Sequence, residues 1–309
     1  MKIVVTLGGN ALLRRGEAMT AENQMKNVRL ACDALKTVAQ DHQLVLSHGN
    51  GPQVGLIALQ NEAYGDNVTP YPFDILGAES QAMVGYMFAQ ALKNVIPEKT
   101  VTCVVTQSEV AADDPAFLNP TKFIGPVYSE EEAHALALEK GWTVKADGQY
   151  WRRVVPSPKP MRIVEMPAIK HLVDAGMLVI SGGGGGVPVI HENGHYRGIE
   201  AVIDKDYCGS LLAQELHADR LVIATDVKGV FVNWGTPEQK CIKRASPEAL
   251  LAMGFAAGSM GPKVLAACEF VKATQGIASI GSLEDITAII AEDAGTLIDA
   301  KATEIEYYP

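Results

Sequence analysis

The sequence lacks the features that mark several common classes of protein. Its 309 residues contain few cysteines, and the five present are scattered with no C-x-x-C pair: Cys32, Cys103, Cys208, Cys241 and Cys268. Such a set favours reduced, buried thiols over a disulfide framework or a zinc site. No apolar run approaches the roughly 18–20 residues that span a bilayer, and the first apolar segment is shorter than a signal-peptide core. We therefore expect a cytoplasmic protein with no membrane partner.

Positive charge is also scarce. Lysine and arginine number 26 against 36 aspartates and glutamates, so the formal net charge is −10, and the two signs are interleaved. This balance argues against nucleic acid as a partner, because a phosphate backbone is bound by a basic surface. It leaves room for a small anion held by a few local lysines.

The common phosphate-binding and hydrolase motifs are missing. The chain has no G-x-x-x-x-G-K-[ST] loop, no H-R-D or D-F-G set and no G-x-S-x-G elbow. The segment from His191 to His195 spells H-E-x-x-H, but a zinc site needs that motif on a helix. Asn193-Gly194 at its centre favours a hairpin turn instead. If the chain binds phosphate, it does so with a different architecture.

The most unusual stretch that is present is a run of five glycines, Gly182–Gly186, in the segment MLVISGGGGGVPV. Each glycine costs about 0.5–1 kcal/mol relative to alanine in regular structure. The usual gain is a backbone that approaches a ligand closely, with N–H groups directed at phosphate oxygens. A flexible linker is the alternative, although linkers rarely lie between two apolar strands.

Two upstream strands end in glycine turns of the same kind. Ile3–Leu7 leads into Gly8-Gly9-Asn10, and Leu44–Leu46 leads through Ser47-His48 into Gly49-Asn50-Gly51. The carboxyl ends of parallel strands meet at one edge of a sheet. We therefore predict that the three turns form one anion-binding edge.

The apolar pattern alternates between strands and helices. We expect strands at Lys2–Leu7, Gln43–Ser47 and Thr100–Thr106, and helices at Ala21–Gln40, from Asn50 as cap with Pro52 in the first turn, and from Asp74 as cap to Val95. Later we expect helices near Pro167–Ala175, over Tyr207–His217, from Ser246-Pro247 and over Met260–Gln275, with strands at Leu221–Thr225, Ile277–Ile280 and Thr296–Ile298. This order predicts an α/β fold whose mainly parallel sheet is covered on both faces.

Residues 107–160 interrupt this alternation. They are rich in proline, aspartate and glutamate, and Ser129 to Glu132 forms a capping-box pattern for a helix that ends at Gly141. A hairpin that turns at Asp147-Gly148 follows. The apolar content is too low for a separate core, so we interpret the segment as an inserted lid.

Three lysines are candidates for binding phosphate. Lys122 lies in the insertion, Lys205 lies between Asp204 and Asp206, and Lys263 lies in the first turn of a helix, where a cation opposes the helix dipole unless an anion is bound. Each alone could be a solvated surface lysine. Together with the glycine turns they indicate phosphoryl transfer between two anions, which needs positive charge and alignment but no general base. Asp204 and Asp206 could position Lys205 or bind Mg²⁺, or Asp206 could simply cap the helix that follows.

The sequence closely resembles the carbamate kinases of the amino-acid kinase superfamily from Lys2 to about Lys272. The matching stretches are LGGNAL (Leu7–Leu12), SHGNGPQVG (Ser47–Gly55), DPAFLNPTK (Asp114–Lys122), RRVVPSPKP (Arg152–Pro160), GGGGVPV (Gly183–Val189), EAVIDKD (Glu200–Asp206) and GSMGPK (Gly258–Lys263). The resemblance implies a three-layer αβα sandwich with a small protruding subdomain, working as a homodimer. It implies interconversion of ATP plus carbamate with ADP plus carbamoyl phosphate, supported by Mg²⁺ and commonly run toward ATP in catabolism.

The resemblance also assigns roles within a single domain that spans residues 1–309. Residues 1–180 form the substrate side and residues 181–309 the nucleotide side. Substrate-binding positions are Gly8, Gly9, Asn10, Gly49, Asn50 and Gly51, to which we add Gly183, Gly184 and Gly185. Catalytic positions are Lys122, Lys205, Lys263, Asp204 and Asp206, with Asp206 also a candidate metal ligand. Nucleotide-binding positions are Thr225, Asp226, Val227, Phe231, Asn233, Trp234, Met260, Pro262 and Lys263.

Three departures from the family pattern leave other interpretations open. Lys-Pro is usual where this chain has Lys122-Phe123, an aspartate is usual at Ala111, and Gly-Arg-Gly is usual where it has Gly148-Gln149-Tyr150. One alternative is a kinase of another small carboxylate, such as an N-acylated amino acid. Another is a weakly catalytic regulatory protein that binds nucleotide or carbamoyl phosphate.

Overall fold

A mainly parallel sheet runs through the centre of the protein. The computed structural model describes residues 1–14, 16–64, 69–255 and 260–309. Among these residues, ten strands join in the order β13-β14-β16-β15-β12-β1-β2-β9-β3, with β17 paired to β14. The bounds are β1 Lys2–Leu7, β2 Gln43–His48, β3 Val101–Cys103, β9 Leu178–Ile180, β12 Arg220–Thr225, β13 Phe231–Val232, β14 Lys240–Ala245, β15 Ile277–Ser282, β16 Thr296–Ile298 and β17 Glu306–Tyr307. The strands from β15 through β3 are parallel to one another, as predicted.

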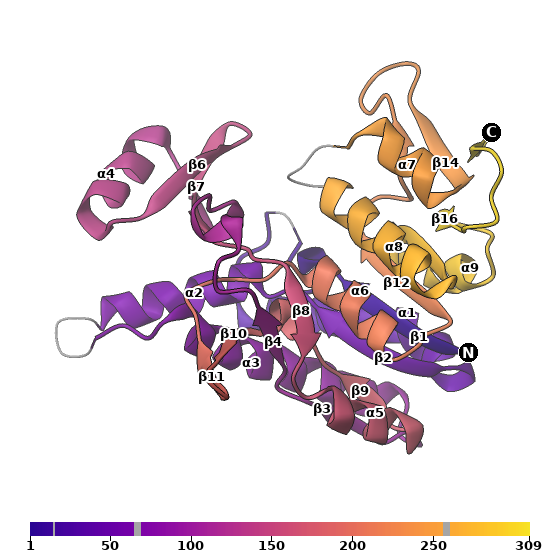
Figure 1. Ribbon diagram of the computed structural model, residues 1–309, viewed down its shortest axis with the longest axis horizontal. Helices are drawn as coiled ribbons and strands as arrows, with labels where there is room; N and C mark the ends of the chain where they lie inside the picture. Colours follow the sequence, from indigo (N-terminus) through magenta and orange to yellow (C-terminus); the bar gives the residue numbers. More distant parts are fainter. Residues whose placement is uncertain (15, 65–68, 256–259) are drawn as a thin grey trace.

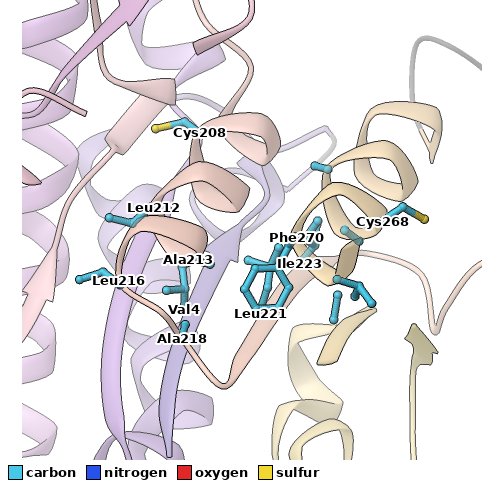
Figure 2. Close-up of a cluster of buried hydrophobic side chains, with 14 of the residues drawn as sticks. Val4, Cys208, Leu212, Ala213, Leu216, Ala218, Leu221, Ile223, Cys268 and Phe270 are labelled. Carbon is cyan, nitrogen blue, oxygen red and sulfur yellow. The ribbon is translucent and has the colours of Figure 1, made fainter. Parts of the chain in front are cut away.

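Helices cover both faces of this sheet, which makes three layers (Figure 1). One face carries α1 (Ala21–Asp41), α3 (Phe73–Val95) and α9 (Ile286–Ile290). The other carries α5 (Met166–Asp174), α6 (Lys205–Glu215), α7 (Pro247–Met253) and α8 (Met260–Thr274). Successive side chains of a strand point to opposite faces. Accordingly, Ile3 and Val5 of β1 join the first core while Val4 joins the second. Figure 2 shows Val4 in this second core with Leu212 and Phe270.

Two smaller sheets extend the central one. The first has the order β11-β10-β4-β8 and comprises β4 (Gln107–Val110), β8 (Pro160–Ile163), β10 (Val187–Glu192) and β11 (His195–Gly198). The second comprises β5 (Lys122–Tyr128), β6 (Thr143–Asp147) and β7 (Tyr150–Val155). With α4 (Glu130–Lys140) it forms the protrusion at the upper left of Figure 1 and contacts α2 (Gly51–Ala63). We call this three-stranded sheet with α4 the lid.

Locally encoded features agree with the sequence. The Ser129 and Glu132 side chains make both hydrogen bonds of the capping box, and Gly141 ends α4 with a φ of 67°. Asn193-Gly194 turns the β10–β11 hairpin, so H-E-x-x-H lies on strands rather than on a helix.

Four expectations about element boundaries were wrong, three of them where a polar residue has a distant partner. β3 stops at Cys103, short of the expected Thr106. Thr106 instead accepts a hydrogen bond from the Gly182 N–H with its side chain and donates its own N–H to the Gln81 side chain. α3 begins at Phe73 rather than after a cap at Asp74, and Glu200 accepts the Phe73 N–H. The Asn50 side chain, expected to cap α2, donates to Ser80 instead. The helix expected from Tyr207 begins at Lys205, and Asp204 rather than Asp206 caps it.

Candidate active site

The carboxyl ends of several parallel strands meet around one cavity. The Gly8 N–H donates to Ala224 O over 3.2 Å and the Gly49 N–H donates to Leu7 O over 3.0 Å, so the turns after β1, β2 and β12 are joined directly. The cavity has a volume of about 640 Å³. Of the predicted site residues, Gly8, Gly9, Lys205, Thr225, Asp226 and Lys263 line it.

One buried carboxylate holds two of the predicted lysines. Lys205 Nζ donates to Asp206 Oδ1, and Lys263 Nζ donates to Asp206 Oδ2 over 3.2 Å. Thr6 Oγ1 also donates to Asp206 Oδ1, over 3.4 Å. Asp206 is 2% exposed and Lys205 8% exposed. The first turn of α6 and the first turn of α8 therefore direct their ammonium groups to the same point.

The third lysine reaches the same end of α6 from the lid. Lys122 Nζ, at the start of β5, donates to Asp204 Oδ2 over 2.6 Å. The other oxygen of Asp204 accepts the Asp206 N–H over 2.8 Å, which is the cap of α6. Asp204 thus connects the lid to the segment that carries Lys205.

The charges of this cluster stabilise one another. Burial would raise the pKa of the Asp204 carboxyl, but Lys122 and Lys205 hold that pKa well below its ordinary value. Burial would lower the pKa of Lys263, but Asp206 and Asp204 outweigh it and raise the pKa. For Lys205 the effect of burial, which lowers the pKa, is larger than the opposing effect of Asp206, so its pKa is lowered. Asp204 is therefore ionised and Lys263 protonated at neutral pH.

The glycine run lies against this cluster and is held by side chains from other elements. The carbonyls of Gly182, Gly183 and Gly185 accept hydrogen bonds, whose donors are Ser47 (3.0 Å), Gln81 (3.0 Å) and Ser108 (2.8 Å) respectively. A Cβ on Gly185, whose φ is +92°, would lie 2.4 Å from the Ile203 carbonyl oxygen just before α6. The glycines therefore allow close packing of the protein chain on itself at this edge.

The remaining predicted residues lie at different distances from the lysine cluster. Gly49 contacts the cluster, since a Cβ there would be 3.3 Å from Lys205 Cδ, and Gly51 begins α2. Phe231 and Trp234 contact each other with ring centroids 5.1 Å apart, and Trp234 is 64% exposed. Val227 and Asn233 lie in the turns on either side of β13, and Met260 and Pro262 lie in the first turn of α8. Gly258 and Ser259 of the GSMGPK stretch are outside the described residues, and Asn10 lies in a 3₁₀ turn after β1.

Sequence reasoning missed several residues that build the site. Arg14, Asn27 and Ser282–Glu284 line the cavity, and Gln81, Thr106 and Ser108 hold the glycine run. Gln81 carried no signal, because a glutamine within a helix is ordinarily a solvated residue. Arg14 lies two residues after the end of the first matching stretch and could have been found from its position there.

The fold and site define the class of the protein. The model of the amino acid kinase family matches residues 1–280. With a layered α/β fold and ammonium groups at the carboxyl edge of its sheet, the protein is a phosphotransferase.

Comparison with individual relatives identifies the family within this class of phosphotransferases. A carbamate kinase of Haemophilus influenzae is 55% identical over 310 residues, covering 100% of both chains. Carbamate kinase from Giardia lamblia bound to citric acid superposes with a TM-score of 0.91 at 41% identity, covering 96% of this chain and 98% of that one. The same enzyme bound to AMP-PNP superposes with a TM-score of 0.88 at 41% identity and the same coverage. The chain belongs to the carbamate kinases of the amino acid kinase family.

Proposed function

We propose that the protein interconverts ATP plus carbamate with ADP plus carbamoyl phosphate, and that in the cell it runs toward ATP in catabolism. The observation that carries this proposal is the pair of ammonium groups on Asp206, next to the glycine turns after β1 and β2. The AMP-PNP complex of the Giardia lamblia relative supports ATP and ADP as the nucleotides.

The arrangement suits transfer between two anions. Carbamate is already deprotonated, so the reaction needs neutralisation of the phosphoryl oxygens and alignment rather than a base. Lys205 and Lys263, held on Asp206, would direct their remaining N–H groups toward the transferred phosphoryl group, and Lys122 would approach from the lid. Because Asp204 and Asp206 fix these ammonium groups beforehand, little reorganisation remains at the moment of transfer.

The two substrates would approach from opposite sides of the lysines. Carbamoyl phosphate would lie on the side of Gly8, Gly9, Asn10, Gly49, Asn50, Gly51 and Gly183–Gly185, under the lid. ADP would lie beyond the end of β12, on the side of Thr225, Asp226, Val227, Phe231, Asn233, Trp234, Met260 and Pro262. The glycine-loop amides of Gly183 and Gly184 are proposed to contribute to the substrate side.

The residues themselves offer Mg²⁺ few ligands. Within the described part of the chain no cluster of three metal-ligating side chains occurs. Both oxygens of Asp206 accept hydrogen bonds from lysines, and both oxygens of Asp204 are similarly engaged. Mg²⁺ commonly binds through nucleotide phosphates and waters with few protein ligands. We therefore propose that Mg²⁺ enters with the nucleotide and that Asp206 positions the lysines.

A coupled assay tests this function. The protein is mixed with ADP, Mg²⁺ and carbamoyl phosphate, and ATP formation is followed through hexokinase and glucose-6-phosphate dehydrogenase. We expect rapid ATP formation. Turnover only with an acyl phosphate of an N-acylated amino acid would favour the other small-carboxylate kinase, and ADP binding without any turnover would favour the regulatory protein.

We also propose a homodimer in the cytoplasm. No helix of the described residues is long and apolar enough to cross a membrane. Light scattering coupled to size exclusion distinguishes a dimer from a monomer of 33.0 kDa.

A further inference from the structure

The lid is attached to the rest of the protein at two separate places. The first is the ion pair between Lys122 and Asp204 at the lysine cluster. The second lies at the other end of the interface, where α2 ends and α3 begins, and it centres on Arg153 of β7.

Arg153 is enclosed by two aromatic rings and a carboxylate. Its guanidinium carbon lies 4.5 Å from the ring centroid of Trp142 in the lid and 4.9 Å from that of Phe73, the first residue of α3. Its Nη1 donates to Glu62 Oε1 over 3.4 Å. Guanidinium groups stack on aromatic faces in this way and gain more when desolvated. The arrangement joins one lid ring and one body ring through a single side chain.

Glu62 receives a second cation from the lid. Lys140 Nζ, at the end of α4, donates to Glu62 Oε2 over 2.7 Å. The side chains of Arg153 and Glu62 are 19% and 21% exposed, so this is a partly buried network rather than an isolated surface pair. A network of several charges is a case in which ion pairs near the surface contribute to stability.

The lid and body backbones also touch where α2 packs on β5. A Cβ on Gly55 of α2 would lie 2.2 Å from the Cα of Gly125 in β5, so neither chain can approach further there. Arg153 pairs with Ile124, and Lys122 pairs with Val155, in the same β5–β7 ladder. Arg153 and Lys122 therefore lie two residue pairs apart in one hydrogen-bonded ladder, which connects them directly.

We propose that Arg153 is a positioning residue that sets the angle of the lid. Held between Trp142 and Phe73 and bonded to Glu62, it fixes the lid about the Gly55–Gly125 contact so that Lys122 reaches Asp204 and the phosphoryl group. Arg153 acts through Lys122 and contacts no reacting atom itself. This inference rests on the proposed function, because it assigns the lid to the carbamoyl phosphate side.

Steady-state kinetics with each substrate varied in turn tests the proposal. We expect Arg153→Ala to raise KM for carbamoyl phosphate about tenfold, since small misplacements of a charged group are costly, while KM for ADP changes less than about twofold. Arg153→Lys keeps a charge for Glu62 but not the stacked plane, so it restores KM only in part. Glu62→Gln shifts KM in the same direction, and the double variant shifts it by less than the product of the single effects.

Arg162→Ala is the matched control, because Arg162 lies on β8 with a side chain 57% exposed and an ion pair of 3.9 Å to Glu109. It should leave both KM values unchanged. Equal changes in the two KM values, or a lower melting temperature with unchanged KM values, would overturn the positioning role. If Arg153→Ala does not fold, the KM values of Glu62→Gln and Arg153→Lys test the positioning role in its place. A wild-type protein that makes no ATP from carbamoyl phosphate contradicts the proposed function, whereas an active wild type with unaffected variants contradicts only the role of Arg153.

Discussion

At the scale of single residues, Asp206 explains how two ammonium groups can be kept together away from water. Burial of like charges is costly unless each has a partner. One carboxylate, 2% exposed, accepts from both Lys205 and Lys263, and Asp204 adds a second negative charge next to it. The lysines are therefore oriented before any substrate binds.

Removing either lysine should slow the reaction greatly. We expect Lys205→Ala and Lys263→Ala each to lower kcat about 10²–10³-fold, roughly 2.7–4 kcal/mol, as when one preorganised donor to a developing charge is lost. Lys272→Ala is a control on α8, the helix that carries Lys263, because Lys272 is exposed and pairs with Glu248 over 3.4 Å. Rates like those of the wild type in either of the first two variants would show that the catalytic residues are wrongly assigned.

His48 makes the stability of the protein sensitive to acid. Burial lowers its pKa from 6.5 to about 4, while the contact with Gly49 opposes the shift and Lys205 adds to it. The unfolded chain takes up the proton below pH 6.5 and the folded protein only near pH 4, so the contribution is complete above pH 6.5 and is lost as pH falls to 4. The loss is on the order of 3 kcal/mol.

Urea unfolding at several pH values checks this expectation. An asparagine side chain does not titrate in this range, so the free energy of unfolding of His48→Asn should fall less between pH 6.5 and 4 than that of the wild type. The comparison concerns the slope, since the substitution also changes baseline stability. Parallel pH profiles of the two proteins would mean that His48 does not contribute.

At the scale of elements, the glycine run holds several parts of the fold together as well as being a candidate substrate contact. Its carbonyls are fixed by Ser47, Gln81 and Ser108, which come from β2, α3 and β4. The run therefore joins the central sheet, a helix on one face and the four-stranded sheet, in addition to any contact that it makes with substrate.

Substitution of Gly185 should reveal the packing requirement. Gly185→Ala places a Cβ 2.4 Å from the Ile203 oxygen at a φ of +92°. We expect a loss of about 3 kcal/mol or more in the free energy of unfolding, from backbone strain of about 1–2 kcal/mol and overpacking of about 1–3 kcal/mol. Gly176→Ala is the control, since its φ is +82° but no atom lies within 4 Å of the added Cβ. Equal losses in the two variants would leave strain alone as the cause.

The features predicted correctly from the sequence are those determined by residues close together along the chain. Apolar periodicity located the helices and parallel strands, and the Ser129–Glu132 capping box and the turn at Asn193-Gly194 were correct because their partners are a few residues away. Asn50 and Thr106 behaved differently from prediction because their partners, Ser80 and Gly182, are fixed only by the folded chain. For the same reason a pattern could place Lys205 between two aspartates but not show which one it contacts.

At the scale of the whole molecule, the lid lies at the upper left of Figure 1 and the segment next to β14 at the upper right, with α6 between them. The lid reaches the lysine cluster through Lys122, and the segment next to β14 carries Trp234, whose side chain is exposed. If the two halves of the chain bind different substrates, changes at these two ends should affect different kinetic constants.

This separation can be tested with two variants. Deletion of Trp142–Tyr150 removes β6 and one ring that stacks on Arg153, so we expect weaker binding of carbamoyl phosphate with a smaller effect on ADP. Trp234→Ala removes an exposed aromatic surface on the proposed nucleotide side, so it should raise KM for ADP severalfold and leave KM for carbamoyl phosphate unaffected. Leu138→Ala, on α4 and 91% exposed, is the control for the lid. If the deletion weakens the binding of ADP more than that of carbamoyl phosphate, the lid lies over the nucleotide. The proposal that Lys122 approaches the phosphoryl group from the substrate side would then be wrong.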